Sequence, residues 1–118
     1  MLVIRQQQMA AFSQYMRINF IQRMITHLRQ SFPEKTVSSD DQQLREIIEQ
    51  GIIISEKYDI TKECDVGRYL DLMFLLSFDF DRQVDWARSI LRKKWVASVK
   101  LDVLHAQYQE TQRGGKYV

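Results

Sequence analysis

The sequence contains few residues that crosslink chains or interrupt helices. Its 118 residues include one cysteine, one proline and four glycines. Sheet proteins need many turn residues, so this scarcity of glycine and proline favours helices. The lone cysteine, Cys64, has no partner for an intramolecular disulfide and excludes a cysteine-based zinc cluster. The length and ordinary globular composition therefore predict a helical protein with a core of its own.

Long hydrophobic runs are also missing. The longest strongly apolar stretch, LMFLLSF at residues 72–78, is far shorter than the roughly 20 apolar residues that cross a bilayer. The opening residues, MLVIRQQQMAAF, place an arginine and three glutamines before any sustained apolar run. That order is not typical of a secretory signal. We therefore expect a cytoplasmic protein.

Charges of opposite sign are separated along the chain. Residues 1–33 carry four arginines and no acid, residues 34–85 carry thirteen acids and six bases, and residues 86–118 carry seven bases and two acids. The segments could neutralise one another within a helical bundle. Alternatively, one of them could form a face of a single sign that attracts a partner.

Apolar residues recur at spacings of three and four, as in amphipathic helices, and no stretch alternates with a period of two. We predict an all-α fold, namely a single-domain bundle of about five helices over residues 1–112 with a flexible tail at 113–118. Ser39, Thr61 and Ser98 are predicted helix caps. The five helices are expected at about residues 5–31, 40–58, 62–76, 84–93 and 99–112.

Gly51 lies on the apolar side of the second predicted helix. A glycine at this position predicts a close crossing with another helix.

The first predicted helix has two apolar stripes, which is more apolar surface than one groove normally covers. Contiguous exposed apolar surface usually marks an interface, so the first helix is a candidate binding surface. Its first stripe consists of Met9, Phe12, Met16, Phe20, Met24 and Leu28, and its second of Tyr15, Ile18, Ile21 and Ile25.

The stretch FDFD, residues 78–81, combines aromatic and acidic side chains. Asp79, Asp81 and Gln83 have the spacing of the first calcium-loop ligands. Val84 and Ile90, however, occupy the positions where that loop needs Gly and Glu. A catalytic carboxylate pair is an alternative that spacing alone does not favour. We predict a packed corner in which Phe78 and Phe80 contact the core. The aspartates are expected to face water, cap the helix at 84–93 and mark a binding edge.

Other residues give weak signals for chemistry. LRKKW, residues 91–95, combines bases with an aromatic residue, which suits nucleic acid, a protein partner or simply a solvated helix end. His27 and His105 lack ligands at metal-binding spacing, and Cys64 is expected to be buried and inert. The sequence therefore predicts no enzyme activity, no cofactor and no metal.

Several motifs follow one another along the chain, namely IRQQQM near the start, MITHLRQSFP at residues 24–33, YDITKECDVGRYLDLM at residues 58–73, FD, and WARSIL at residues 86–91. In this order they resemble those of a set of short, mostly uncharacterised all-helical bacterial proteins that are often encoded beside type VI secretion effector genes. The resemblance extends to about Leu104. One departure is Asp59, where the family often has Gly, so the turn before Ile60 must use a residue that tolerates the left-handed conformation less readily. The positions that match the family pattern, most of them expected to maintain the fold, are Arg68, Tyr69, Asp71, Asp79 and Trp86.

The resemblance implies a non-catalytic accessory that binds another protein. This would be a chaperone or adaptor that holds a secreted effector in the cytoplasm, or an immunity protein that neutralises a toxin. Nucleic-acid binding and homo-oligomerisation remain alternatives from other classes. The residues expected to bind the partner are Met9, Phe12, Met16, Arg17, Arg68, Asp79, Asp81 and Trp86.

Overall fold

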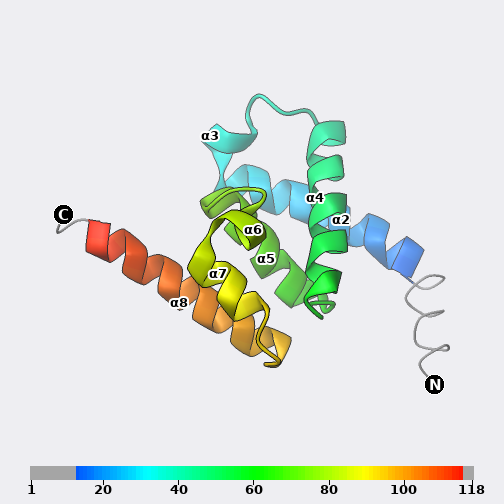
Figure 1. Ribbon diagram of the computed structural model, residues 1–118. Coiled ribbons are helices and arrows are strands. Elements are labelled where there is room, and N and C mark those ends of the chain that lie inside the picture. Colours follow the sequence, from blue (N-terminus) through cyan, green and yellow to red (C-terminus); the bar gives the residue numbers. More distant parts are fainter. Residues whose placement is uncertain (1–12, 116–118) are drawn as a thin grey trace, which may run out of the picture. The chain divides into compact units, whose positions relative to one another are not determined.

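A computed structural model describes the backbone of residues 13–115 and the side chains of residues 14–113 (Figure 1). This part of the chain forms helices and no strands, so the predicted all-α class is confirmed. It contains seven helices where about five were expected, because two short helices of four residues each were not anticipated. The helices are α2 (Ser13–Ser31), α3 (Pro33–Thr36), α4 (Asp41–Lys57), α5 (Glu63–Leu75), α6 (Phe80–Gln83), α7 (Asp85–Leu91) and α8 (Ala97–Gly115).

The contacts of the chain group it into two compact units, Met1–Glu49 and Gln50–Val118. Helix α4 begins in the first unit and ends in the second. The single domain expected over residues 1–112 stays a prediction. Residues 113–115 of the expected tail belong to α8, which continues through Gly115, and residues 116–118 lie outside the described part.

In the first unit, α2 ends where the sequence predicts, because Pro33 cannot continue its hydrogen-bonding pattern and instead begins α3. Residues 5–12 of the predicted helix lie outside the described part. Arg29, near the end of α2, holds the loop that follows. Its guanidinium donates hydrogen bonds to the carbonyls of Thr36 and Ser39, both at 3.0 Å, and pairs with Asp41 at 2.7 Å.

The start of α4 is a capping box placed one residue later than predicted. The Asp40 carboxylate accepts a hydrogen bond from the backbone N–H of Gln43 at 2.8 Å. In return, the Gln43 side chain accepts one from the backbone N–H of Asp40 at 2.9 Å. Ser39 and Gln42 were the expected pair. The observed pair satisfies the backbone donors of Asp40 and Gln43 instead, and its cap is an anionic acceptor, which the helix dipole favours.

The end of α4 is a Schellman motif centred on Asp59. The N–H of Ile60 bonds to the carbonyl of Ser55 at 3.0 Å, and the N–H of Asp59 to that of Glu56 at 3.1 Å. This pattern requires a left-handed residue, and Asp59 has φ 62°. Ile60, the next residue, is completely buried. The expectation that the turn before Ile60 uses Asp in place of Gly is therefore met in detail.

Gly51 lies where α4 meets α5, as predicted. A side chain on Gly51 would collide with the Cδ2 atom of Leu70 and come within 3.0 Å of the Met73 sulfur. The glycine is needed because the two helices approach too closely for a methyl group. Its cost to helix propensity is thus offset by the contact that it permits.

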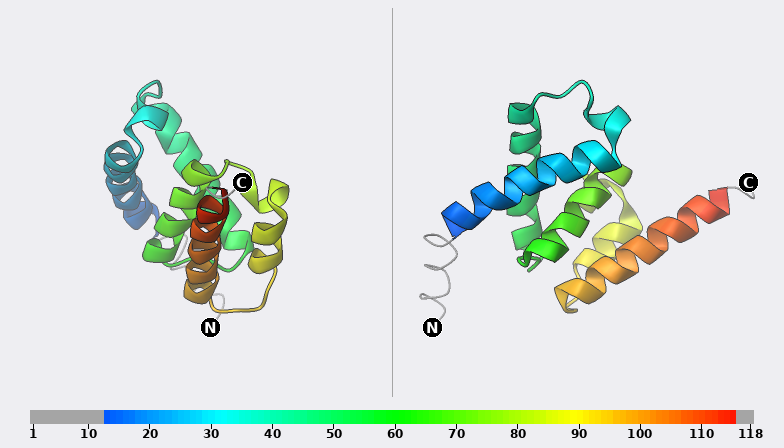
Figure 2. Two further views of the ribbon diagram at one scale, coloured as in Figure 1. Left: turned by 90° about the vertical axis from the view of Figure 1, so that its left-hand side faces the viewer. Right: turned by 180° about the vertical axis from the view of Figure 1, so that it is seen from behind.

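Helix α8 contacts α5 and α7 in the second unit (Figure 2). The core of this unit contains several side chains without any exposed surface, among them Tyr69, Phe80, Leu101 and Leu104. Two predicted caps are wrong. Helix α5 starts after Lys62 without a side-chain cap, and Ser98 lies inside α8. The region predicted as one helix at 84–93 is α7, preceded by the short α6.

Candidate functional site

The structure describes six of the eight residues that were predicted to bind a partner. Met9 and Phe12 lie outside the described residues. Met16 and Arg17 belong to α2 in the first unit, and the other four belong to the second. The second-unit residues are Arg68, Asp79, Asp81 and Trp86.

The early part of α2 exposes large apolar side chains. Tyr15 is 80% exposed, Ile18 55% and Met16 38%. Further along the same helix, Phe20, Ile21, Met24, Ile25 and Leu28 are buried. The two stripes expected from the sequence are therefore covered only from Phe20 onward, and the exposed part lies at residues 14–19.

Arg68 joins α5 to α8. Its guanidinium forms an ion pair with Asp102 at 2.6 Å, and its carbonyl oxygen lies 3.3 Å from Nε2 of His105. Burial of His105 lowers the pKa of its imidazole, and this outweighs the opposing effect of the hydrogen bond to the Arg68 carbonyl. In this position Arg68 has a clear structural role. Trp86, on α7, is half-buried.

The FDFD corner differs from the prediction in its detail. Phe80 is buried and contacts the ring of Tyr69, with centroids 4.9 Å apart, as expected. Phe78, however, remains 48% exposed and meets Phe74 edge-on. Asp79 is half-buried and accepts a hydrogen bond from the Ser77 hydroxyl at 3.1 Å.

Asp81 is the clearest correction. It is buried, with 6% of its surface exposed, and does not face water. It does not cap the following helix either, because the residue before α7 is Val84. Its carboxylate accepts a 2.7 Å hydrogen bond from the hydroxyl of Tyr58. The spacing of apolar residues did not predict that Asp81 is buried, because the short helix α6 changes the direction of the chain there.

Asp81 and two tyrosines form a buried polar cluster. Burial, followed by the hydrogen bond to Asp81, raises the pKa of Tyr58 to about 12. Burial, followed by the charge of Asp81, raises the pKa of Tyr69 further. The Tyr69 hydroxyl and the second carboxylate oxygen of Asp81 are buried and form no hydrogen bond with the described residues. Both phenols therefore stay protonated at neutral pH, and the cluster is suited to holding structure rather than to moving protons.

Lys100 is a buried cation that the sequence analysis missed. Only 3% of its surface is exposed, and its ammonium donates to the carbonyls of Tyr58 at 2.9 Å and Leu91 at 3.0 Å. The Tyr58 carbonyl directly follows α4, and the Leu91 carbonyl belongs to the last residue of α7. The negative ends of the two helix dipoles lie at these positions. A sequence signal existed, since Lys100 stands four residues before buried Leu104 on α8.

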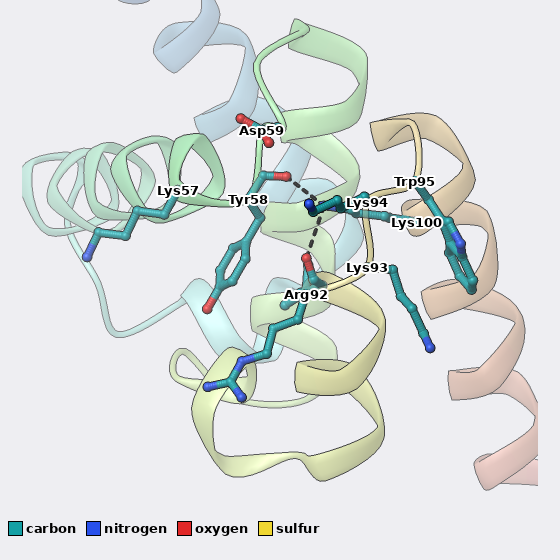
Figure 3. Close-up of a pocket in the computed structure, with 9 residues that line it drawn as sticks. Lys57, Tyr58, Asp59, Arg92, Lys93, Lys94, Trp95 and Lys100 are labelled. Carbon is teal, nitrogen blue, oxygen red and sulfur yellow. Dashed lines mark hydrogen bonds between the residues drawn. The ribbon is translucent and has the colours of Figure 1, made fainter.

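A basic pocket opens over Lys100 (Figure 3). It has a volume of about 520 Å³ and lies among the end of α4, the segment after α7 and the start of α8. The residues that line it come from segments more than 30 positions apart, so only the fold brings them together. They are Lys57, Tyr58, Asp59, Leu91, Arg92, Lys93, Lys94, Trp95 and Lys100.

The charges in the pocket are not balanced. Five of its residues are cationic and only Asp59 is acidic. Within residues 14–113, no carboxylate forms an ion pair with Lys57, Arg92, Lys93 or Lys94. Lys93 lies over Trp95, with its ammonium 5.7 Å from the ring centroid. The LRKKW segment supplies half of the site, and Lys57 and Lys100 complete it.

The described residues offer little for other kinds of chemistry. No three His, Cys, Asp or Glu side chains among them are grouped where they could hold a metal ion. Cys64 is exposed, contrary to expectation. None of the helices between residues 13 and 115 combines the length and apolar character needed to span a bilayer. The arrangement can bind an anion or another macromolecule.

Comparison with known proteins finds no matching family model, no curated relative and no similar solved structure. Two surfaces of the described residues are therefore the candidates for function, namely the exposed start of α2 and the basic pocket.

Proposed function

We propose that the protein is a non-catalytic accessory that binds a cognate secreted effector in the cytoplasm, as a chaperone or adaptor of type VI secretion. The observation that carries this proposal is the exposure of Tyr15, Met16 and Ile18 on α2. Monomeric soluble proteins rarely expose large contiguous apolar patches, and such patches commonly mark contact sites for other proteins.

The charge of α2 indicates what kind of segment would bind there. The helix contains Arg17, Arg23 and Arg29 and no acidic residue, and of these Arg29 is paired with Asp41 beyond the end of the helix. A partner helix with an apolar stripe and acidic flanks would match both the exposed side chains and the charge. We therefore expect the effector to contribute an acidic amphipathic segment.

The test is co-expression with the effector encoded by the neighbouring gene, followed by size-exclusion chromatography. The wild-type chain should co-elute with it, and a Tyr15→Glu, Ile18→Glu variant should not. The matched control is Gln22→Glu, Thr26→Glu, which adds the same charge at exposed positions of the same helix. Co-elution of the Tyr15, Ile18 variant at wild-type levels would contradict the proposal.

An immunity protein is the alternative that uses the same surface. Growth assays separate the two roles, since an immunity protein restores growth to cells that express the toxin. A chaperone or adaptor is needed only for delivery of the effector. Self-association through α2 is the remaining use of this surface, and light scattering that shows a monomer at all concentrations would exclude it.

Nucleic-acid binding is favoured by a different observation, the cations beside Trp95 in the basic pocket. It predicts salt-sensitive retention on heparin or DNA. Substitution of Arg92, Lys93 and Lys94 by Gln should abolish that retention. Unchanged retention in the triple variant would exclude this alternative.

A further inference from the structure

We propose that the basic pocket binds a compact ligand with two or three phosphate groups, such as a nucleotide or a short inorganic polyphosphate. The pocket lies wholly within the second unit and uses none of the α2 residues that carry the proposed function. The two proposals can therefore fail separately.

The concentration of charge is the first argument. Residues 50–118 contain eleven lysines and arginines and ten acids, so this unit is nearly neutral. Five of the eleven cations nevertheless line one pocket, against one acid. A ligand that brings several negative charges into a small volume would balance this excess of positive charge. A single carboxylate group carries too little charge to do so.

The kind of cation is the second argument. Four of the five are lysines, and only Arg92 has a guanidinium. Arginine binds carboxylate and phosphate alike through two parallel hydrogen bonds, whereas the ammonium of lysine acts as a point charge and is a common ligand of phosphate. The composition of the pocket therefore suits the densely charged oxygens of a phosphate chain.

Lys100 is the third argument, because it gives the pocket a fixed positive group. Two of its three N–H donors are used by the carbonyls of Tyr58 and Leu91 (Figure 3). The carbonyls hold the ammonium in place, but no carboxylate of the described residues pairs with it. Its positive charge is therefore not neutralised by a carboxylate of the described residues, and Lys100 belongs to the wall of the pocket. Such a pre-positioned cation lowers the entropic cost of binding.

Size and the aromatic ring favour a small ligand over an extended chain. A volume of about 520 Å³ falls within the roughly 300–1,000 Å³ typical of small-molecule sites. The remaining charges of the unit are mostly acidic and would repel a long polyanion. Trp95 is 42% exposed beside Lys93, so a nucleobase could stack near the cations that hold its phosphates.

Trp95 also provides a fluorescence signal with which ligand binding can be measured. The sequence has two tryptophans, and a Trp86→Phe variant leaves Trp95 as the only one. In this background we expect tripolyphosphate and ATP to change the tryptophan fluorescence saturably at 150 mM salt, while equal ionic strength of sodium chloride does not. Both ligands should also raise the melting temperature, because they bind the folded state.

Two triple variants, each of which loses three positive charges, test whether the ligand binds in the basic pocket. Arg92→Gln, Lys93→Gln, Lys94→Gln removes three pocket cations and should weaken both ligands by roughly 10-fold or more, since charge-assisted hydrogen bonds to the phosphate oxygens are lost. Lys62→Gln, Arg82→Gln, Arg113→Gln removes three exposed cations outside the pocket and should change binding less than about 3-fold by screening arguments. Equal weakening by both variants would overturn the proposal.

The choice of ligands separates the remaining outcomes. Tighter binding of ATP than of tripolyphosphate identifies a nucleotide, and equal binding identifies the phosphate chain itself. Hexaglutamate that binds as tightly as tripolyphosphate would overturn the phosphate assignment in favour of an acidic peptide. A single-stranded DNA 12-mer that binds far more tightly than ATP would overturn it in favour of nucleic acid. The Tyr15→Glu, Ile18→Glu variant should bind ATP like the wild type.

Discussion

The hydroxyl of Tyr58 donates a 2.7 Å hydrogen bond to Asp81, which is 23 residues later in the chain. The backbone carbonyl of the same tyrosine accepts a 2.9 Å hydrogen bond from the buried ammonium of Lys100. Tyr58 thus links three segments, the end of α4, the corner at α6 and the first turn of α8. It also lines the basic pocket, so the stability of this unit and the shape of the pocket depend on the same residue.

Tyr58→Phe should lower the free energy of unfolding by about 1.5–3 kcal/mol, because it leaves the buried carboxylate of Asp81 without its hydrogen bond. The check is urea denaturation of Tyr58→Phe, Asp81→Ala and the double variant. The loss in the double variant should be smaller than the sum of the single losses. Strict additivity of the two would show that the hydrogen bond contributes nothing.

The folded protein should lose stability in alkaline solution. The pKa of Tyr58 rises from 10.0 to about 12 on folding, so the folded state holds this proton more tightly than the unfolded state. The resulting stabilisation is complete below pH 10 and disappears as the pH rises from 10 to 12. Denaturation curves at pH 9, 10 and 11 measure the slope. Tyr58→Phe should make the slope shallower, with the residual slope due to Tyr69. An unchanged slope would contradict this assignment.

Gly51→Ala should destabilise the protein although alanine is the better helix former. The gain in helix propensity is about 1 kcal/mol, while overpacking against Leu70 and Met73 costs about 1–3 kcal/mol. We expect a net loss of about 1 kcal/mol in thermal or urea unfolding. Gln50→Ala, at the exposed neighbouring position, is the control and should be neutral or stabilising. A stabilised Gly51→Ala protein would mean that the helices can separate at little cost.

Asp59→Gly should stabilise the protein by up to about 1 kcal/mol, because glycine adopts positive φ without steric strain. Asp59→Val should destabilise it, since a β-branched residue is strained at φ 62°. Asp59 also carries the only negative charge of the basic pocket. Asp59→Asn removes that charge but still tolerates the left-handed conformation, so this variant separates charge from backbone strain. If glycine and valine give equal stability, the strain argument fails.

His105 should make the protein less stable in mild acid. Its pKa is lowered by burial, so the unfolded state binds the proton more readily. The contribution of the neutral imidazole is complete above its unfolded pKa of 6.5 and is lost as the pH falls below that value. Stability measured from pH 7.5 to pH 5 should fall less steeply in His105→Gln than in the wild type. Identical pH profiles would show that His105 is solvated as freely in the folded state as in the unfolded state.

Local features of the fold could be predicted because they depend on neighbours in sequence. The all-α class follows from the periodicity, the end of α2 from Pro33, and the close crossing from Gly51. The inward position of Asp81 and the exposure of Phe78 could not be predicted. Phe78 lies just before helix α6 and Asp81 lies within it, and this helix of only four residues is too short to show a period of its own.

For the candidate sites, the sequence by itself determined the basic LRKKW segment and the excess of apolar residues on the first helix, because both are properties of consecutive residues. Only the tertiary structure decided that Lys57 and Lys100 join that segment in one pocket, and that Tyr15 and Ile18 are exposed while Ile21 and Ile25 are buried. The physical reason is that charge concentration and burial depend on distances through space. Those distances are set by the packing of elements that lie far apart in the chain.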